Sequence, residues 1–142
     1  MREIKFRGKG KYCEYKGKWL YGYLYVYNEP KIYSILNEND VVQVNVFGSF
    51  VPAFINVDSN TIGQYTGLKD KNGIEIYEGD IIERTVIDNG FGKFMSVVGY
   101  KDGGFILKEE WGYAPFHDLC NSVYEVIGNI HDNPELLEKK ED

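Results

Sequence analysis

The sequence predicts an all-β protein, and three observations carry this prediction. Short segments of alternating or β-branched residues recur along the 142-residue chain, and alternation with a period of two is the signature of a β-strand. Glycine-containing turn signals separate these segments, most densely between residues 63 and 82. Tyrosine, which suits half-buried sheet faces, occurs 12 times. Closely spaced short strands with such turns are typical of a small barrel or sandwich.

The first part of the chain is expected to contain five extended segments. Each combines β-branched or aromatic residues and is followed by a polar or glycine-containing break. The expected strands are residues 3–8, 19–27, 32–36, 41–47 and 50–57. Turns are expected at residues 8–10, 16–18, 28–30, 37–40 and 48–49.

The second part of the chain carries the strongest turn signals. Asn72-Gly73 predicts a hairpin turn because both residues tolerate positive φ. Residues 77–80 (Tyr-Glu-Gly-Asp) predict a second turn directly before another strand. Strands are expected at residues 63–68, 74–77, 81–87, 93–100, 104–108 and 122–130, with further hairpin turns at 88–90 and 101–104.

The end of the chain predicts a short C-terminal helix. Asn133 suits the N-cap, Pro134 the first helical position, and Glu135 the positive end of the helix dipole. Together with the polar break at residues 58–60, these signals divide the chain into three parts. They are a β-rich N-terminal part (1–60), a small β-domain (61–132) and a helical tail (133–142).

Charge is distributed unevenly along the chain, whose net charge is −6. Residues 1–18 hold seven Lys or Arg against two acidic residues, which gives +5, whereas residues 61–142 hold eight against sixteen, which gives −8. The acidic second half repels phosphate groups, so any nucleic-acid role has to use the N-terminal arm. The alternative is that both segments are simply solvated surface.

The sequence also predicts the cellular setting. Cys13 and Cys120 lie far apart and form no CxxC pair, which disfavours a disulfide framework. The first residues are charged where a signal peptide has an apolar core, and no apolar run approaches the roughly 20 residues that span a bilayer. We expect a cytoplasmic protein that has no membrane association.

Four blocks of sequence resemble the YopX-like proteins of bacteriophages and prophages. They are residues 4–8 (IKFRG), 17–22 (GKWLYG), 63–81 (GQYTGLKDKNGIEIYEGDI) and 126–137 (VIGNIHDNPELL). The resemblance implies a β-rich N-terminal part, a C-terminal part similar to an SH3-type barrel, and an origin in a phage or prophage. It implies no established activity, and the matching glycines and apolar residues suit turns and strand starts.

Metal and thiol chemistry are weakly supported by the sequence. His117 precedes Cys120 by three residues, and Cys13 and His131 lie elsewhere. A zinc site needs about four ligands, usually in closely spaced pairs, and a reactive thiolate needs an electropositive setting that this acidic region does not offer. We therefore predict no metal, no cofactor and a buried Cys120.

Other catalytic patterns are incomplete. The glycine-rich residues 88–93 lack the spacing of a phosphate-binding loop and no helix signal follows them. Glu109-Glu110, and Glu78 with Asp80, are carboxylate pairs without a predicted apolar pocket to separate their pKa values. We predict no catalytic residue and no small-molecule substrate. An enzyme would require a pocket that joins His117 or His131 to distant carboxylates.

Binding remains the favoured class of function. The candidate residues are aromatic side chains in or near loops and two cations of the N-terminal arm: Tyr65, Tyr77, Trp111, Tyr113, Arg7 and Lys9. Aromatic side chains are common anchors of interfaces. Two alternatives stay open: Tyr65 and Tyr77 brace the hairpin at Asn72-Gly73, and the aromatic loop at 111–116 is a lid rather than a binding surface.

Two functional hypotheses follow. The first is a non-enzymatic module that binds a protein partner or a second copy of itself, because strand edges and aromatic patches favour oligomers. The second is a nucleic-acid accessory factor that stacks bases on Trp19 and nearby tyrosines. Its cations would be those of the basic arm: Arg2, Lys5, Arg7, Lys9 and Lys11.

Overall fold

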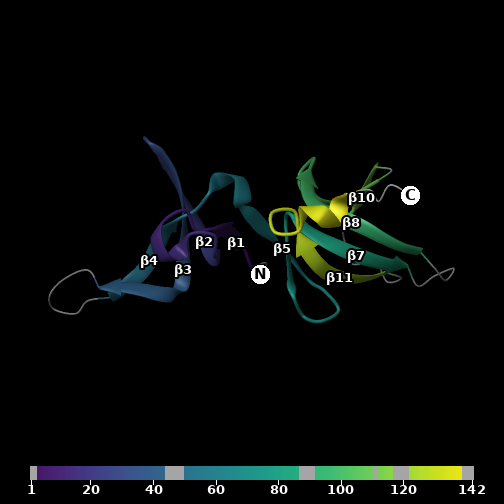
Figure 1. Cartoon of the computed structure of the whole chain (residues 1–142), viewed down its shortest axis with the longest axis horizontal. Helices are drawn as coiled ribbons and strands as arrows, with labels where there is room; N and C mark the ends of the chain where they lie inside the picture. The colour runs from purple at the N-terminus through teal and green to yellow at the C-terminus, as the bar shows by residue number, and fades with distance from the viewer. Residues whose placement is uncertain (1–2, 44–49, 87–91, 111, 117–121, 139–142) are drawn as a thin grey trace. The chain divides into compact units, whose positions relative to one another are not determined.

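The protein is all-β, as predicted. The computed structural model describes residues 3–43, 50–86, 92–110, 112–116 and 122–138. These residues form β-strands and three short 3-10 helices, and they contain no α-helix. The chain divides into two compact units, Met1–Tyr65 and Thr66–Asp142 (Figure 1). The predicted boundaries at residues 60 and 132 stay predictions.

The first sheet has six strands in the order β4-β3-β2-β1-β5-β6. In chain order, the strands of this sheet and the 3-10 helices between them are β1 (Phe6–Lys9), η1 (Cys13–Tyr15), β2 (Trp19–Asn28), β3 (Lys31–Gln43), β4 (Phe50–Asn56), η2 (Ser59–Thr61), β5 (Gly63–Lys69) and β6 (Glu75–Tyr77). The pairs β1–β2, β2–β3, β3–β4 and β1–β5 are antiparallel.

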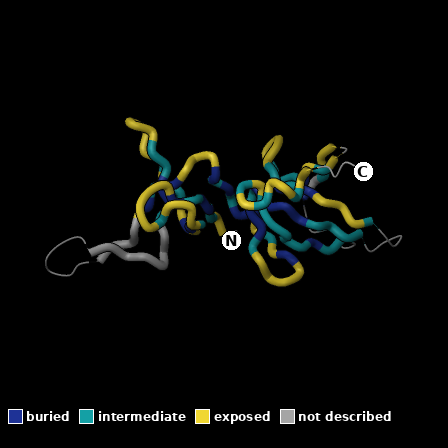
Figure 2. Tube along the Cα trace, in the orientation of Figure 1, coloured by how far each residue is buried: buried dark blue, intermediate teal, exposed yellow. Residues whose placement is uncertain are grey.

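One face of the first unit is buried. Its core consists of Leu20, Ile35, Ile55 and Val57, with Leu24 and other apolar side chains packed against it. Leu24, Ile35 and Ile55 are directly opposite one another across β2, β3 and β4, so their side chains share a face. Figure 2 shows buried segments in the strands and exposed segments mostly in the turns.

Two expected turns in the first unit are wrong. Residues 37–40 belong to β3, where the pairing with β4 shifts between Asn37 and Val41; the polar residues therefore form an irregularity within a long strand. Gly8 and Lys9 belong to β1, because this strand is paired with Leu20 and Trp19 of β2. Residues 44–49, which include part of an expected strand and a turn, lie outside the described residues.

The second sheet has five strands in the order β10-β9-β8-β7-β11. The elements are β7 (Asp80–Val86), β8 (Gly92–Lys101), β9 (Gly104–Glu109), β10 (Gly112–Pro115), β11 (Ser122–Asn129) and η3 (Pro134–Leu137). The core of the second unit consists of Ile76 of β6 together with Ile82, Val98, Leu107, Phe116 and Tyr124. Among the described strands, the hydrogen-bonded order is open at β10 and β11, so no closed barrel is formed.

The hairpin at Asn72-Gly73 is present, but its geometry differs from the expected two-residue turn. Gly73 has a φ of 80°, whereas Asn72 is not in the positive-φ region. The Gly73 N–H donates to the Asp70 carbonyl (3.0 Å), and the Asp70 N–H donates to the Ile74 carbonyl (2.8 Å). This is a three-residue loop that ends in a glycine bulge. The turn at 101–104 is confirmed, with Asp102 and Gly103 both at positive φ between paired Lys101 and Gly104.

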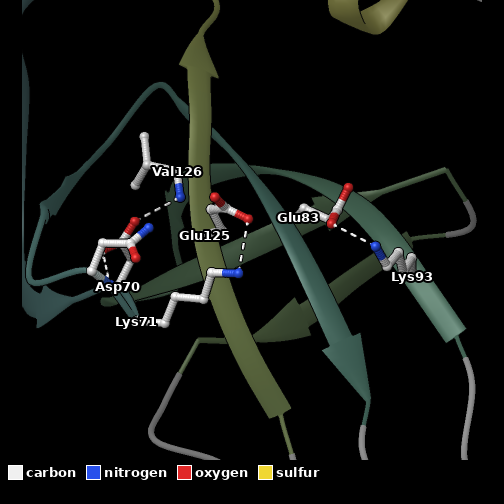
Figure 3. Close-up of polar contacts among 7 residues, drawn as sticks. Asp70, Lys71, Glu83, Lys93, Glu125 and Val126 are labelled. Carbon is white, nitrogen blue, oxygen red and sulfur yellow. Dashed lines mark hydrogen bonds and ion pairs between the residues drawn. The ribbon is translucent and has the colours of Figure 1, made fainter.

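Asp70 holds this hairpin and attaches it to β11. Its Oδ1 accepts hydrogen bonds from the backbone N–H groups of Asn72 (2.8 Å) and Ile74 (2.9 Å). Its Oδ2 accepts one from the N–H of Val126 on β11 (2.9 Å). Figure 3 shows the Asp70 side chain beside Val126, with Lys71 reaching Glu125 of the same strand. The carboxylate therefore replaces backbone pairing at a point where two distant segments meet.

The environment of Asp70 favours its charged form. Burial is the largest single influence and raises the pKa of Asp70, but the three backbone donors and Lys71 together outweigh it. The pKa of Asp70 therefore lies below its usual value of 3.8.

The predicted C-terminal helix is only a four-residue 3-10 helix, Pro134–Leu137. The expected N-cap is wrong, because the Asn133 side chain caps no helical N–H and instead accepts from the N–H of Asn129 (3.2 Å). Residues 139–142 lie outside the described part of the chain.

Candidate functional site

The first unit presents a row of exposed aromatic side chains, which we call the tyrosine face. It consists of Tyr21, Tyr23, Tyr25 and Tyr27 of β2 together with Phe54 of β4. Each of these side chains is between 44% and 59% exposed. Single exposed apolar residues are normal on a protein surface, whereas contiguous apolar patches are candidates for interaction sites.

The tyrosine face follows from the alternation of β2. Because successive strand residues point to opposite faces, Leu20 enters the core while Tyr21 and its alternate neighbours point to solvent. Tyr23 is paired with Leu36 of β3, and Leu36 is paired with Phe54 of β4. The rings of Tyr25 and Phe54 meet edge to face with centroids 5.8 Å apart, so the row extends across three strands.

Cations lie beside the tyrosine face on β1. Arg7 is paired with Tyr21, and Lys9 with Trp19. The Arg7 guanidinium lies 4.6 Å from the centroid of the Trp19 ring, and the Lys9 Nζ lies 5.4 Å from the same ring. Such cation–π contacts are worth about 0.5–2 kcal/mol. Lys5, next on the same face, lies 5.3 Å over Tyr65 and 3.4 Å from Glu3.

Further lysines gather where the tyrosine row begins. The Gly10 N–H donates to the Lys18 carbonyl, and the Gly17 N–H donates to the Gly10 carbonyl (both 2.9 Å). These bonds hold the chain around Lys9 next to the chain that leads into Trp19. Three further lysines of this region, Lys11, Lys16 and Lys18, are exposed. We call Lys9, Lys11, Lys16 and Lys18 the basic end, because their backbone lies where the tyrosine row begins. The Lys11 N–H also donates to the Asn56 carbonyl (2.9 Å), and the Lys11 Nζ lies 5.6 Å from the centroid of the Tyr12 ring.

Four of the candidate binding residues predicted from the sequence are buried or half-buried in the structure. Tyr65 and Tyr77 are only 6% and 2% exposed, and the Tyr77 hydroxyl donates to Glu75 (3.3 Å). Arg7 is 5% exposed, stacked on Trp19. Lys9 is half-buried.

Tyr113 lies in the second unit on β10 and is exposed. The Lys101 Nζ lies 4.1 Å over its ring, and both residues line an open groove of about 420 Å³. Trp111 lies outside the described residues, as do His117 and Cys120. The structure therefore brings Arg7 and Lys9 together and places Tyr113 in a different unit from them.

The paired carboxylates considered for catalysis have structural partners. Asp80 is buried and its Oδ2 accepts from the Tyr77 N–H (2.8 Å), which closes the turn at residues 77–80. Glu109 accepts from Arg84 (2.7 Å) and from the Ser96 hydroxyl (3.2 Å). Within the described residues, no group of three His, Cys, Asp or Glu side chains is arranged to hold a metal ion.

The nucleic-acid hypothesis named only Trp19 and the tyrosines near it, without positions, although the sequence contains a sharper signal for the tyrosine face. Tyrosine occupies every second position from residue 21 to residue 27, which in a strand places all four on one face. Which face is buried depends on β3 and β4, and these strands supply Ile35 and Ile55 to the opposite side.

None of the helices in the described ranges is long and apolar enough to cross a membrane.

The fold and the site define a class of protein: an all-β chain of two compact units, whose first sheet carries an exposed aromatic surface beside clustered cations. The family model described as YopX protein matches residues 5–138. The chain therefore belongs to the YopX family, as its four sequence blocks indicated.

Two solved structures are similar over nearly the whole chain. Protein EF1440 from Enterococcus faecalis is 31% identical, with a TM-score of 0.54 over 97% of this chain and 100% of that chain. Protein yopX from Bacillus subtilis is 19% identical, with a TM-score of 0.59 over 99% of this chain and 100% of that chain. At its lower identity, the second similarity shows the fold alone. No curated protein matches the sequence.

Proposed function

We propose that this chain is a non-enzymatic binding module that acts by contacting another macromolecule through the tyrosine face. The observation that carries this proposal is the row of four tyrosines and Phe54 exposed on one side of the first sheet. Large aromatic side chains bury much area at low cost in side-chain entropy, and for that reason they dominate interfaces.

A binding role rather than catalysis is supported by the use of the carboxylates. Asp70 and Asp80 accept hydrogen bonds from backbone N–H groups of turns, and Glu109 accepts from Arg84 and Ser96. These groups are occupied in holding strands and turns together, and a general acid or base needs its proton-transfer site open to a substrate.

The second unit is proposed to be a partly open barrel of the SH3 type. Its last strand, β11, pairs with β7, the first strand of the consecutive series β7-β8-β9-β10, and this is the strand order of SH3-type barrels. The pairing of β11 with β7 shifts between Val126 and Gly128, and such bulges allow a sheet to curl.

A phage or prophage origin, with action in the cytoplasm of the bacterial host, is part of the proposal. The family resemblance supports the phage or prophage origin, and the similarity to protein EF1440 from Enterococcus faecalis supports a bacterial host. Sequencing the genes on both sides tests it: phage structural or replication genes are expected, and a locus of ordinary host genes would contradict the origin.

Two classes of occupant are proposed for the tyrosine face. A protein, including a second copy of the chain, is favoured by the aromatic composition, because aromatic residues are enriched in protein interfaces. Nucleic acid is favoured by a separate observation, the cations of β1 that lie over Trp19.

The proposal is tested by substituting residues of the tyrosine face and measuring self-association and the binding of host protein and nucleic acid. The double variant Tyr23→Thr/Tyr25→Thr keeps strand propensity, because threonine is β-branched. Tyr100→Thr is the matched control: Tyr100 is as exposed as Tyr25, 54% against 53%, and each meets a phenylalanine edge to face.

Sedimentation of the purified chain measures self-association, and capture from host lysate measures bound protein and nucleic acid. Self-association, captured protein or captured nucleic acid should fall in Tyr23→Thr/Tyr25→Thr, and the quantity that falls should be unchanged in Tyr100→Thr. Equal behaviour of both variants in all measurements would refute the assignment of the tyrosine face.

A further inference from the structure

We infer that the tyrosine face binds single-stranded nucleic acid, with Trp19 and the tyrosines of β2 stacking on bases and the lysines of the basic end holding phosphates. This inference rests on the proposed function and names the occupant of the same surface. Three features of the described residues support it: the spacing of the rings, the position of the cations and the shape of the site.

The ring spacing matches a nucleic-acid strand. Trp19, Tyr21, Tyr23, Tyr25 and Tyr27 occupy alternate positions of one continuous strand. Alternate strand residues lie about 6.7 Å apart, which is about twice the 3.4 Å spacing of nucleotides along a stacked strand. Consecutive rings can therefore receive consecutive bases of an extended strand, and every base offers a π-face.

The positive charge lies where this path begins. Lys9 is paired with Trp19, and the hydrogen bonds of Gly10 hold Lys11, Lys16 and Lys18 next to it. Residues 1–18 carry a net charge of +5 although the chain as a whole carries −6. A surface that places positive charge beside stacking rings on an acidic protein is complementary to a phosphate backbone with exposed bases.

The site is suited to a single strand rather than a duplex. Phe54 and the tyrosine rings lie on the exposed face of a sheet, where they can contact splayed bases but cannot enter a groove to read paired ones. The bases of a duplex are already stacked on each other, so only an unpaired strand can exchange that stacking for contact with the rings.

Arg7 has a positioning role in this arrangement. It is buried and lies 4.6 Å from the Trp19 ring centroid, so it fixes the ring plane at the start of the row. The phosphate contacts are assigned instead to Lys9 and Lys11, one half-buried and one exposed. For this reason Lys9→Ala/Lys11→Ala is the appropriate charge variant, whereas Arg7→Ala removes packing against the Trp19 ring.

The experiment uses the full chain and a fluorescein-labelled 12-nucleotide oligothymidylate, whose binding is followed by fluorescence anisotropy. If about four lysines neutralise phosphates, the affinity falls about 50-fold between 50 and 200 mM salt, since each contact contributes about −0.7 to the salt slope. Each stacked base is worth at least a fivefold affinity, so Tyr23→Thr/Tyr25→Thr should lose about 25-fold or more. Tyr100→Thr should bind like the wild type.

Further arms separate the possible outcomes. Lys9→Ala/Lys11→Ala should reduce the salt slope by about 1.4, and a 12-base-pair duplex should bind more weakly than the single strand. The inference would be overturned if no binding is seen at 50 mM salt. It would also be overturned if Tyr23→Thr/Tyr25→Thr binds as tightly as Tyr100→Thr and the wild type. If the oligothymidylate does not bind but Tyr23→Thr/Tyr25→Thr abolishes self-association, the inference fails while the proposed function stands. Circular dichroism of each variant verifies that it is folded.

Discussion

Replacement of Asp70 by alanine should destabilise the second unit by about 4 kcal/mol. The carboxylate accepts three backbone hydrogen bonds, at 2.8 Å from Asn72, 2.9 Å from Ile74 and 2.9 Å from Val126. A hydrogen bond to a charged group is worth about 1.5–3 kcal/mol, which sums to at least about 4.5 kcal/mol. Partial access of water to the freed N–H groups reduces this sum, and losses above about 5 kcal/mol are rare for one substitution.

Asp70→Asn should fall between the wild type and Asp70→Ala. The asparagine carbonyl oxygen can still accept from Asn72 and Ile74, but its NH2 group then faces the Val126 N–H, donor against donor. The expected loss is about 2 kcal/mol, close to one charge-assisted bond. This variant separates the link to β11 from the closure of the hairpin.

Urea unfolding followed by circular dichroism measures these losses. Glu83→Gln is the control, because its partner Lys93, at 3.4 Å, is largely exposed (Figure 3), and exposed ion pairs contribute about 0–1 kcal/mol. A loss below about 1 kcal/mol for Asp70→Ala would refute the assignment of Asp70 as the anchor of the hairpin.

Three other predictions concern the fold. Because the pKa of Asp70 is lower in the folded chain, the unfolded chain binds more protons in acid. The stabilisation that the Asp70 carboxylate supplies is complete above its unfolded pKa of about 4 and is lost as pH falls toward its folded pKa. Asp70→Asn should therefore flatten the pH dependence of the urea midpoint below about pH 4. Gly22→Ala should lower the free energy of unfolding by more than about 2 kcal/mol, because the added Cβ would overlap the Leu36 carbonyl oxygen on β3. Gly104→Ala should lower it far less, because the space around Gly104 is open. Equal urea midpoints for the two variants would contradict this prediction. Glu109→Gln should lower the thermal midpoint by removing the charge partner of the mostly buried Arg84, at a cost of about 1–3 kcal/mol; an unchanged midpoint would show that the pair contributes nothing.

Much of the fold could be predicted because local signals and tertiary structure agree. The β2 segment alternates strictly, and Asp102-Gly103 adopts positive φ at both positions, as its composition requires. At Asn72-Gly73 the same kind of signal was overridden, because the Asp70 side chain accepts the Asn72 N–H and thereby selects a longer loop.

Other features depend on partners that are distant in sequence. Gly8-Lys9 resembles a turn, but pairing with β2 extends it. Asn133 has the composition of an N-cap, but its side chain bonds the N–H of Asn129. Neither outcome can be deduced from a window of neighbouring residues, because local preference is weak relative to a specific tertiary contact.

The candidate site was only partly predictable for the same reason. Arg7 and Lys9 were identified from their charge, and the structure adds that both lie against the Trp19 ring. Tyr65 and Tyr77 looked like loop aromatics but are buried. The tyrosines of β2 became a surface only when Ile35 and Ile55 fixed the opposite face as the core.

The most direct test of the tyrosine face as a binding surface is chemical-shift mapping by NMR. The oligothymidylate is titrated into the isotopically labelled full chain, and the shifts of each backbone amide are recorded. If the tyrosine face binds the oligothymidylate, the largest shifts fall in β1 and β2, at Lys9 and from Trp19 to Tyr27. Shifts confined to the second unit, around Lys101 and Tyr113, would contradict it.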